Sequence, residues 1–277
     1  MSAAPGADPF GEFERAGWNA GRAAPYHQAL GDITRRPVEA LLDAAGVGPG
    51  VRVLDVASGP GYAAARAAAR GAEATGVDFS AEMVALARRL HPGAEFAQAD
   101  AQALPFADGA FDAVVANFLM PHVSDLPAVV RELARVARPG GRVALTTWDA
   151  ETVGFLRWFL EAAAEAGAVP PPDLPPGPPF FQFSRDDEFA ALLADAGLAG
   201  AEVGTVAFVH RIDDLDRFWA DLLAGSVRSH ALVLSQTAEV QAAIRRAYEA
   251  RLAPFARAGG FDVPCAVKLG VGTVSTR

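Results

Sequence analysis

The chain has 277 residues, and its 33 acidic and 24 basic side chains give a formal net charge of −9 at pH 7. Hydrophobic residues make up 51% of the sequence and charged residues 21%, so the chain can bury a large core and does not have the composition of a disordered protein. The acidic balance argues against nucleic acid or a membrane surface as a partner. The length allows one enlarged domain, or a domain with a cap.

The N-terminal residues, Met1 to Phe10, lack the positive start and the apolar stretch of a signal peptide, and no apolar run long enough for a membrane helix follows. Cys265 is the single cysteine and cannot form an internal disulfide, and no Cys/His cluster has the spacing of a zinc site. We therefore expect a cytoplasmic protein without a metal that acts on a small molecule, and a homo-oligomer is compatible with this expectation.

Short apolar runs alternate with alanine-rich stretches between residues 47 and 150, which is the rhythm of βα units with a parallel sheet. The expected strands are 51–56, 73–77, 95–98, 111–117 and 142–148, and the expected helices are 62–70, 81–90 and 126–137. Ser80 precedes the second of these helices and is a good N-cap. The fold class is therefore α/β, with a doubly wound, mostly parallel sheet.

The rest of the chain divides into an N-terminal helical cap segment (1–46), a helical and proline-rich insertion (151–200), and a C-terminal part of the core sheet (201–277) that carries a helical cap over 213–258. The expected helices are 153–166, 185–196, 215–223 and 237–258, and the expected strands are 201–210 and 263–276. The alternation in the last strand suits an antiparallel sheet. The proline-rich run 169–180 is interpreted as a lid, with a partner-binding motif as the alternative.

The turn Gly59-Pro-Gly61 follows the first expected strand and opens a helix, so its backbone N–H groups would face a polar or anionic ligand. The run from Gly59 to Ala64 also fits the G-x-G-x-x-A pattern of dinucleotide-binding proteins, with Asp78 as the ribose ligand. Taken alone, the turn leaves open a nicotinamide cofactor, or a turn needed only for packing.

An ordered set of motifs accompanies the expected strands. It consists of Asp55 within 53–61, Asp78, the pair Asp100-Ala101, the segment 111–117 ending in Asn117, and Arg138-Pro-Gly-Gly141. Over about residues 47–148 this ordered set resembles the class I S-adenosylmethionine-dependent methyltransferases, particularly the small-molecule branch related to ubiquinone and menaquinone biosynthesis. The resemblance implies a seven-stranded sheet of order 3-2-1-4-5-7-6 with the last strand antiparallel. It also implies S-adenosyl-L-methionine as cofactor and S-adenosyl-L-homocysteine as product.

The resemblance places Asp78 on the ribose hydroxyls and Asp100 near the adenine amino group, roles that suit carboxylate acceptors. The cofactor-binding residues that it implies are Asp55, Ala57, Ser58, Gly59, Gly61, Asp78, Phe79, Met83, Asp100, Ala101, Asn117 and Phe118. Ala57 departs from the pattern, since the family has its first glycine there. Asp112 is interpreted as a solvated carboxylate outside the site.

The acceptor side is expected beyond the carboxyl ends of the strands, where His122 is the candidate catalytic base and a structural role is its alternative. The candidate substrate-pocket residues are Tyr26, His27, Trp148, Phe155, Phe183 and Trp219. Their aromatic character favours a mostly apolar metabolite, such as a quinone, a polyketide or an isoprenoid-like compound, methylated on oxygen, carbon or nitrogen.

Three alternative functions are compatible with the sequence. With the same fold and cofactor, the protein would be a cyclase or isomerase, or a non-catalytic sensor that only binds the cofactor. A nicotinamide-dependent oxidoreductase is disfavoured by the ordered set from Asp55 to Gly141.

Overall fold

The computed structural model describes residues 8–152 and 154–276, and the side chain of residue 155 is outside the description. In this part of the chain one eight-stranded sheet has the order β3-β2-β1-β4-β5-β8-β6, and the short β7 pairs with β8. The strands are β1 (Arg52–Val56), β2 (Glu73–Asp78), β3 (Glu95–Gln98), β4 (Phe111–Asn117), β5 (Ala137–Trp148), β6 (Leu198–Ile212), β7 (Ala256–Arg257) and β8 (Gly260–Val274).

The predicted doubly wound sheet is confirmed. The strands β1 to β5 pair in parallel, whereas β8 runs antiparallel between β5 and β6. The last long strand, β8, therefore occupies the place that the resemblance implied for the seventh strand. It is numbered β8 because the two-residue strand β7 precedes it in the chain. β6 extends beyond its predicted range because β8 supplies backbone partners at both of its ends. β5 begins earlier than predicted, at Ala137, which pairs with Phe111 of β4.

The helices complete two layers around this sheet and a separate cap. They are α1 (Pro9–Trp18), α2 (Ala23–Ala29), α3 (Gly31–Thr34), α4 (Val38–Ala44), α5 (Tyr62–Ala69), α6 (Ala81–Leu90), α7 (Leu126–Val136), α8 (Gly154–Glu165), α9 (Asp186–Asp195), α10 (Leu215–Ala224), α11 (Arg228–Leu234) and α12 (Ala238–Leu252), with short 3₁₀ turns η1 (Met120–His122) and η2 (Ala253–Phe255). None of the helices in the described ranges is long and apolar enough to cross a membrane.

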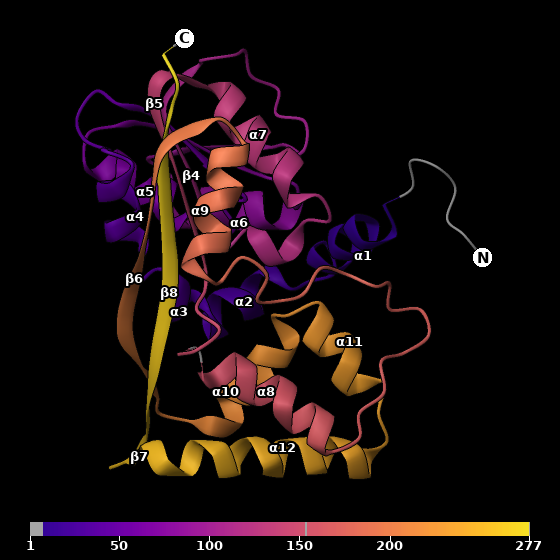
Figure 1. Ribbon diagram of the computed structural model, residues 1–277. Coiled ribbons are helices and arrows are strands. Elements are labelled where there is room, and N and C mark those ends of the chain that lie inside the picture. The colour runs from indigo at the N-terminus through magenta and orange to yellow at the C-terminus, as the bar shows by residue number, and fades with distance from the viewer. Residues whose placement is uncertain (1–7, 153, 277) are drawn as a thin grey trace.

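Alternating side chains of the parallel strands bury both faces of the sheet. Val53 of β1 packs with α4 and α5, whereas its neighbour Leu54 packs with α7 and α9 on the opposite face. Figure 1 shows these two helix pairs on either side of the strands. Burial on both faces explains why β4 is mostly apolar and why four of the five residues of β1 are buried.

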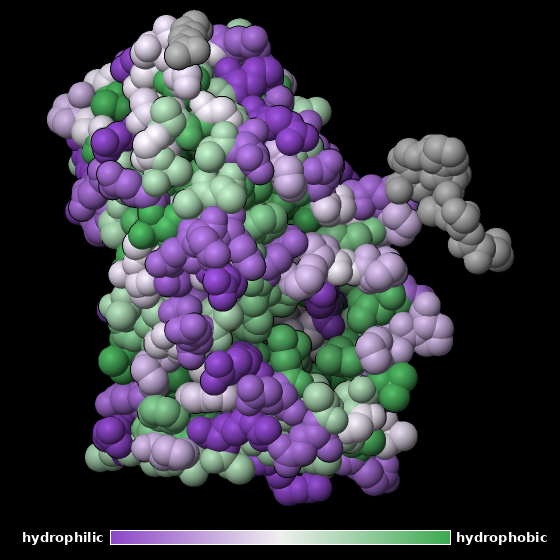
Figure 2. Space-filling model, in the orientation of Figure 1, coloured by the Kyte–Doolittle hydropathy of each residue, from purple (hydrophilic) through white to green (hydrophobic). Residues whose placement is uncertain are grey.

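The cap lies beyond the carboxyl ends of the parallel strands. It contains α8, α10, α11 and α12, and Figure 1 shows them gathered at the lower end of the long strands β6 and β8. The cap has its own core around Phe159, Tyr248 and Val263. Figure 2 shows a hollow on this face of the molecule between the core, above, and the cap, below.

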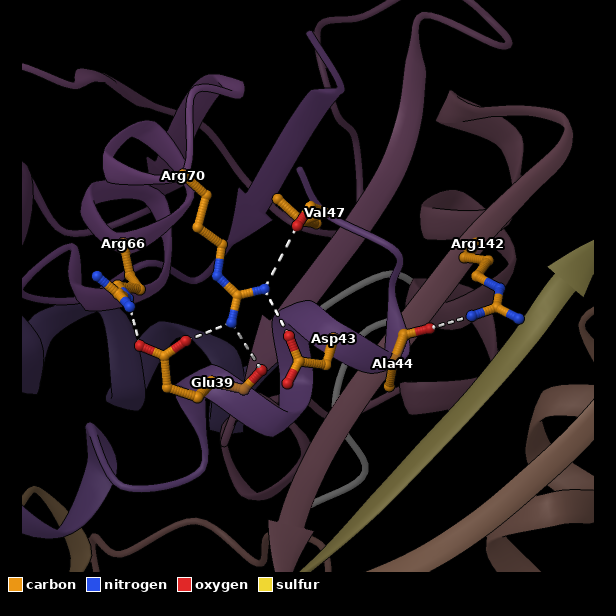
Figure 3. Close-up of polar contacts among 7 residues, drawn as sticks. All are labelled: Glu39, Asp43, Ala44, Val47, Arg66, Arg70 and Arg142. Carbon is orange, nitrogen blue, oxygen red and sulfur yellow. Dashed lines mark hydrogen bonds and ion pairs between the residues drawn. The ribbon is translucent and has the colours of Figure 1, made fainter. Parts of the chain in front are cut away.

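Arginines join the N-terminal segment to the core on the far side from the cap. Arg70, the C-cap residue of α5, donates to Asp43 Oδ1 at 2.7 Å, to the backbone oxygens of Glu39 and Val47, and to the Glu39 carboxylate (Figure 3). Arg66 also pairs with Glu39. α4 is therefore attached to α5 by ion pairs at one face and by apolar packing at the other.

Two helices in the C-terminal part differ from the sequence prediction. The helix predicted over 237–258 ends at Leu252, because Pro254 lies in a 3₁₀ turn and β7 then pairs with β8. The seven-residue α11 was not predicted. It is short, and only Val233 among its residues is buried, so its sequence carries little periodic signal.

Candidate cofactor and acceptor site

A cleft of about 800 Å³ lies at the carboxyl ends of β1, β2 and β4, and we call it the main cleft. It brings together the following residues from the sequence prediction: Tyr26, Ala57, Gly59, Asp78, Phe79, Met83, Asp100, Ala101, Asn117, Phe118 and His122. Parallel strands end at one edge of a sheet, so residues that are far apart in sequence meet there.

A side pocket of about 280 Å³ continues the main cleft past the glycine turn and contains Asp55 and Ser58. Ser58 Oγ is buried and has no hydrogen-bond partner among the described residues. An unpaired buried hydroxyl costs free energy, so this oxygen is available to a polar ligand. Gly61 lies behind the turn instead, where an added Cβ would come within 2.5 Å of Phe96.

The backbone of the turn is left-handed at alternating positions, with φ of +55° at Ala57, +50° at Gly59 and +85° at Gly61. Ala57 keeps this conformation without the freedom of the glycine that the family pattern has here. An added Cβ at Gly59 would meet no atom within 4 Å, although Gly59 lines both the main cleft and the side pocket. The space beside Gly59 is thus open to a ligand that approaches the backbone closely.

Asp78 ends β2 and is only 6% exposed. Its Oδ2 accepts a hydrogen bond from the Gly59 N–H at 2.8 Å and its Oδ1 accepts one from the Ser80 N–H at 2.8 Å. Desolvation raises the pKa of Asp78, and these two backbone donors oppose the shift. Each carboxylate oxygen retains acceptor capacity on the cleft side, which suits the vicinal hydroxyls of a ribose.

Asp55 is buried below the turn and accepts a hydrogen bond from the Ala64 N–H in the first turn of α5, at 2.9 Å. Burial raises its pKa to about 7, and the nearby Asp78 adds to the shift. Asp112 lies apart from the site at the other end of its strand, in ion pairs with Arg52 and Arg138. These partners hold the pKa of Asp112 well below its usual range.

The residues after β4 are held by a chain of hydrogen bonds. Asn117 Nδ2 donates to the Thr34 backbone oxygen at 2.7 Å, and Thr146 Oγ1 donates to Asn117 Oδ1 at 2.7 Å. Phe118 has φ of +60°, and its N–H donates to Thr146 Oγ1 at 3.1 Å. Such a conformation in a bulky residue is strained, and here it turns the Phe118 ring onto Trp148, 4.1 Å between centroids.

The N-terminal helices close one side of the main cleft. Ser80 Oγ donates to the Trp18 backbone oxygen, and the Gly21 N–H donates to the Glu82 carboxylate, so the end of α1 is attached to the start of α6. Glu14 and Arg15 of α1 therefore face the main cleft. A helical cap segment is predicted over residues 1–46, but these two residues are not among the predicted site residues. In the sequence, α1 is marked only by its N-cap residue Asp8 and the following Pro9.

A second cavity, of about 570 Å³, adjoins the main cleft and is mostly apolar; we call it the apolar chamber. The two cavities share five lining residues, namely Glu14, Trp18, Tyr26, Phe118 and His122. Trp148, Phe180 and Leu222 supply much of the remaining apolar wall, and Arg228 of α11 adds a guanidinium. Burial lowers the pKa of Arg228.

Four of the candidate pocket residues lie elsewhere or cannot be placed. Trp219 packs on Phe159 and Tyr248 inside the cap. His27 Nδ1 lies 2.6 Å from the Tyr62 hydroxyl, and Phe183 packs against the sheet core near α9. The side chain of Phe155 lies outside the described residues. No group of three or more His, Cys, Asp or Glu side chains within the described ranges is placed to hold a metal ion.

Residues 54–145 match the family model described as a methyltransferase domain. The chain is 39% identical over 145 residues to a malonyl-[acyl-carrier protein] O-methyltransferase of Enterobacter lignolyticus, a match that covers 52% of this chain and 58% of that protein. It is 47% identical over 110 residues to a demethylmenaquinone methyltransferase of Beutenbergia cavernae, covering 40% of this chain and 46% of the relative. The chain thus spans about half the length of the curated relatives it matches.

The fold is shared with solved structures. An N-methyltransferase of Haemonchus contortus, solved with phosphomonomethylethanolamine and S-adenosylhomocysteine, aligns with a TM-score of 0.58 at 19% identity, over 98% of this chain and 61% of that one. The YcgJ protein of Bacillus subtilis aligns with a TM-score of 0.54 at 20% identity, over 86% and 97% of the two chains. Residues 54–145 thus resemble a methyltransferase domain in sequence, and the fold around them is shared with solved methyltransferase structures.

Proposed function

We propose that this protein transfers the methyl group of S-adenosylmethionine to a mostly apolar small molecule. The observation that carries the proposal is the junction of the two cavities, where five residues line both the polar main cleft and the apolar chamber. A cofactor in the first cavity and an acceptor in the second would meet at this junction. Methyl transfer depends chiefly on such alignment of the reacting atoms.

The residues of the main cleft fit the cofactor. Asp78 would accept from the ribose hydroxyls, and Asp100 from the adenine amino group. The open space beside Gly59 and the free hydroxyl of Ser58 would take the methionine end. Phe79 and Met83 would flank the adenine, Ala101 would offer its backbone N–H, and Asn117 with Phe118 would lie near the sulfur. When bound, the cofactor supplies an electrophilic methyl group on a sulfonium.

The chamber favours an acceptor that is aromatic or isoprenoid-like, such as a quinone or a polyketide. Tyr26, Phe118 and Trp148 present aromatic rings at its walls, and rings of this kind favour flat, apolar ligands. His122 lies at the junction and is the candidate base for an acceptor that must lose a proton.

Calorimetric titration with S-adenosylhomocysteine tests the cofactor site without needing the acceptor. We expect saturable binding that Asp78→Ala weakens by about 1–3 kcal/mol, the usual worth of hydrogen bonds to a charged group. Asp173→Ala, in an exposed loop, is the matched control and should bind as the unmodified protein does. A folded protein that binds NADH but not S-adenosylhomocysteine would overturn the proposal in favour of an oxidoreductase.

Transfer itself is tested with S-adenosylmethionine labelled on its methyl carbon and a panel of phenols, quinols and amines. We expect label in at least one apolar acceptor. Tight cofactor binding with no labelled product from any member of the panel would favour a sensor or a cyclase instead.

A further inference from the structure

Glu14 is a buried carboxylate at the junction of the two cavities. It is 1% exposed, and its Oε2 accepts a hydrogen bond from the Trp18 indole N–H at 2.9 Å. The same Oε2 lies 2.8 Å from His122 Nδ1. The other oxygen, Oε1, has no hydrogen-bond partner among the described residues. Burying a carboxylate costs free energy unless its hydrogen-bond partners compensate, and here only one of the two oxygens has such partners.

The contact with Glu14 determines which nitrogen of the His122 ring carries the proton. An ionised carboxylate only accepts hydrogen bonds, so Nδ1 of His122 carries the proton of this bond. In the neutral ring Nε2 then holds a free electron pair, and no described residue is hydrogen-bonded to it. The Trp18 ring packs edge-on against the imidazole, 5.5 Å between centroids at 80°, and restricts its rotation.

The other charged groups around His122 come from three elements. Asp78 at the end of β2 interacts with it electrostatically across the main cleft. Arg15 of α1 lines the main cleft but is paired with Asp100. Arg228 of α11 lines the apolar chamber, where it donates to the Pro178 backbone oxygen at 3.2 Å and lies over the Phe10 ring. Glu14 is therefore the one of these charged groups that is hydrogen-bonded to the imidazole.

We propose that Glu14 is a positioning residue that makes His122 Nε2 a general base, and that the acceptor is an apolar molecule with a weakly acidic phenol or enol hydroxyl. This inference rests on the proposed function. A neutral amine attacks with its own electron pair and needs no base beforehand, whereas a hydroxyl becomes a good nucleophile as its proton leaves.

The step balances in atoms and charge. His122 Nε2 takes the hydroxyl proton, and the oxygen uses the released electron pair to form a bond to the methyl carbon. The carbon–sulfur bond breaks with its pair on sulfur, so the positive charge of the sulfonium is replaced by that of the imidazolium. The Glu14 carboxylate then stabilises the imidazolium through the hydrogen bond at Nδ1, as the carboxylate of a catalytic triad does for its histidine.

Nitrogen-15 NMR of the imidazole tests the pair in the free protein, with His122 assigned from His122→Gln. We expect the proton on Nδ1 in the neutral ring. Glu14→Gln keeps the shape of the side chain and removes the charge, so the neutral ring should carry its proton on Nδ1 less often in this variant. Glu12→Gln, exposed on the same helix, is the control and should leave the proton on Nδ1. A proton on Nε2 in the unmodified protein, or the same proton position in Glu14→Gln as in the control, would overturn the pair.

A matched pair of acceptors, 1-naphthol and 1-naphthylamine, tests the hydroxyl assignment with labelled S-adenosylmethionine. We expect methylation of the naphthol, with kcat about 10²- to 10⁴-fold lower in His122→Gln. Glu14→Gln should lower kcat for the naphthol and leave its KM unchanged, whereas Glu12→Gln should change neither. Methylation of the amine alone, or of neither probe by protein that binds S-adenosylhomocysteine, would overturn the assignment. Failure to bind S-adenosylhomocysteine would instead overturn the proposed function, whatever the NMR result.

Discussion

The Arg15 guanidinium of α1 lies 2.7 Å from Asp100 Oδ2, beyond the end of β3, and so joins two residues 85 positions apart. Arg15 also lies over the Phe79 ring, with its guanidinium carbon 5.4 Å from the ring centroid. Both contacts join α1, on one side of the main cleft, to residues at the ends of β2 and β3 on the other side. The pair therefore holds α1 against the proposed adenine end of the cofactor site.

We expect Arg15→Ala to raise the Kd of S-adenosylhomocysteine about two- to fivefold, mostly through faster dissociation, because an exposed ion pair is worth at most about 1 kcal/mol. Stopped-flow fluorescence measures the rate. The effect should shrink in about 0.5 M salt, which screens exposed charges. Arg185→Ala removes an exposed arginine far from the cleft and serves as the control. Equal dissociation rates for the two variants at low salt would contradict this role.

Alanine substitutions at the two glycines of the turn should have different effects, one mainly on stability and the other mainly on ligand binding. Gly61→Ala places a Cβ 2.5 Å from Phe96 Cζ in a left-handed backbone, so we expect about 2–4 kcal/mol of destabilisation in denaturant unfolding. Gly59→Ala meets no atom and should cost about 1–2 kcal/mol of stability. Its Cβ would occupy the open space at the cleft, so its main effect should be weaker binding of S-adenosylhomocysteine. Unchanged affinity in Gly59→Ala would argue against a ligand beside this turn.

Asp55 should make stability depend on pH. Its folded-state pKa is about 7, against about 4 in an unfolded chain, so between these values the folded state holds a proton that the unfolded state has lost. This contribution is complete below about pH 4 and disappears as the pH rises through about 7. Asp55→Asn has the same shape and does not titrate. We expect the unfolding free energy of the unmodified protein to fall relative to the variant between pH 4 and pH 7, by on the order of a few kcal/mol. A difference that stays constant with pH would show that Asp55 does not hold this proton.

Arg70 should matter more for stability than its neighbour Arg66. Its side chain is 17% exposed and reaches two carboxylates and two backbone oxygens, whereas that of Arg66 is 50% exposed and pairs with Glu39 alone (Figure 3). We expect Arg70→Ala to lower the unfolding free energy by about 1–2 kcal/mol and Arg66→Ala by less than about 0.5 kcal/mol. Thermal unfolding followed by circular dichroism compares them, and a reversed order would contradict the assignment of the network to Arg70.

The core fold and the residues of the proposed cofactor site could both be predicted from the sequence alone. Strand and helix periods are local, so the βα units could be identified from the spacing of apolar residues. Parallel strands all end at one edge, which is why Asp78, Asp100 and Asn117 could be grouped from their positions at the ends of the expected strands. The glycine turn was equally clear, since its conformation depends on the residues within it.

The elements that cover this edge of the sheet could not be predicted from the sequence. Glu14 and His122 are 108 residues apart, and an amphipathic helix such as α1 does not state which surface its buried face will meet. The same reason applies to Trp219, whose helical spacing fits a pocket wall as well as the cap core in which it lies. The direction of each of these side chains depends on how the cap and the N-terminal helices pack against the sheet, and that packing is a non-local property of the whole chain.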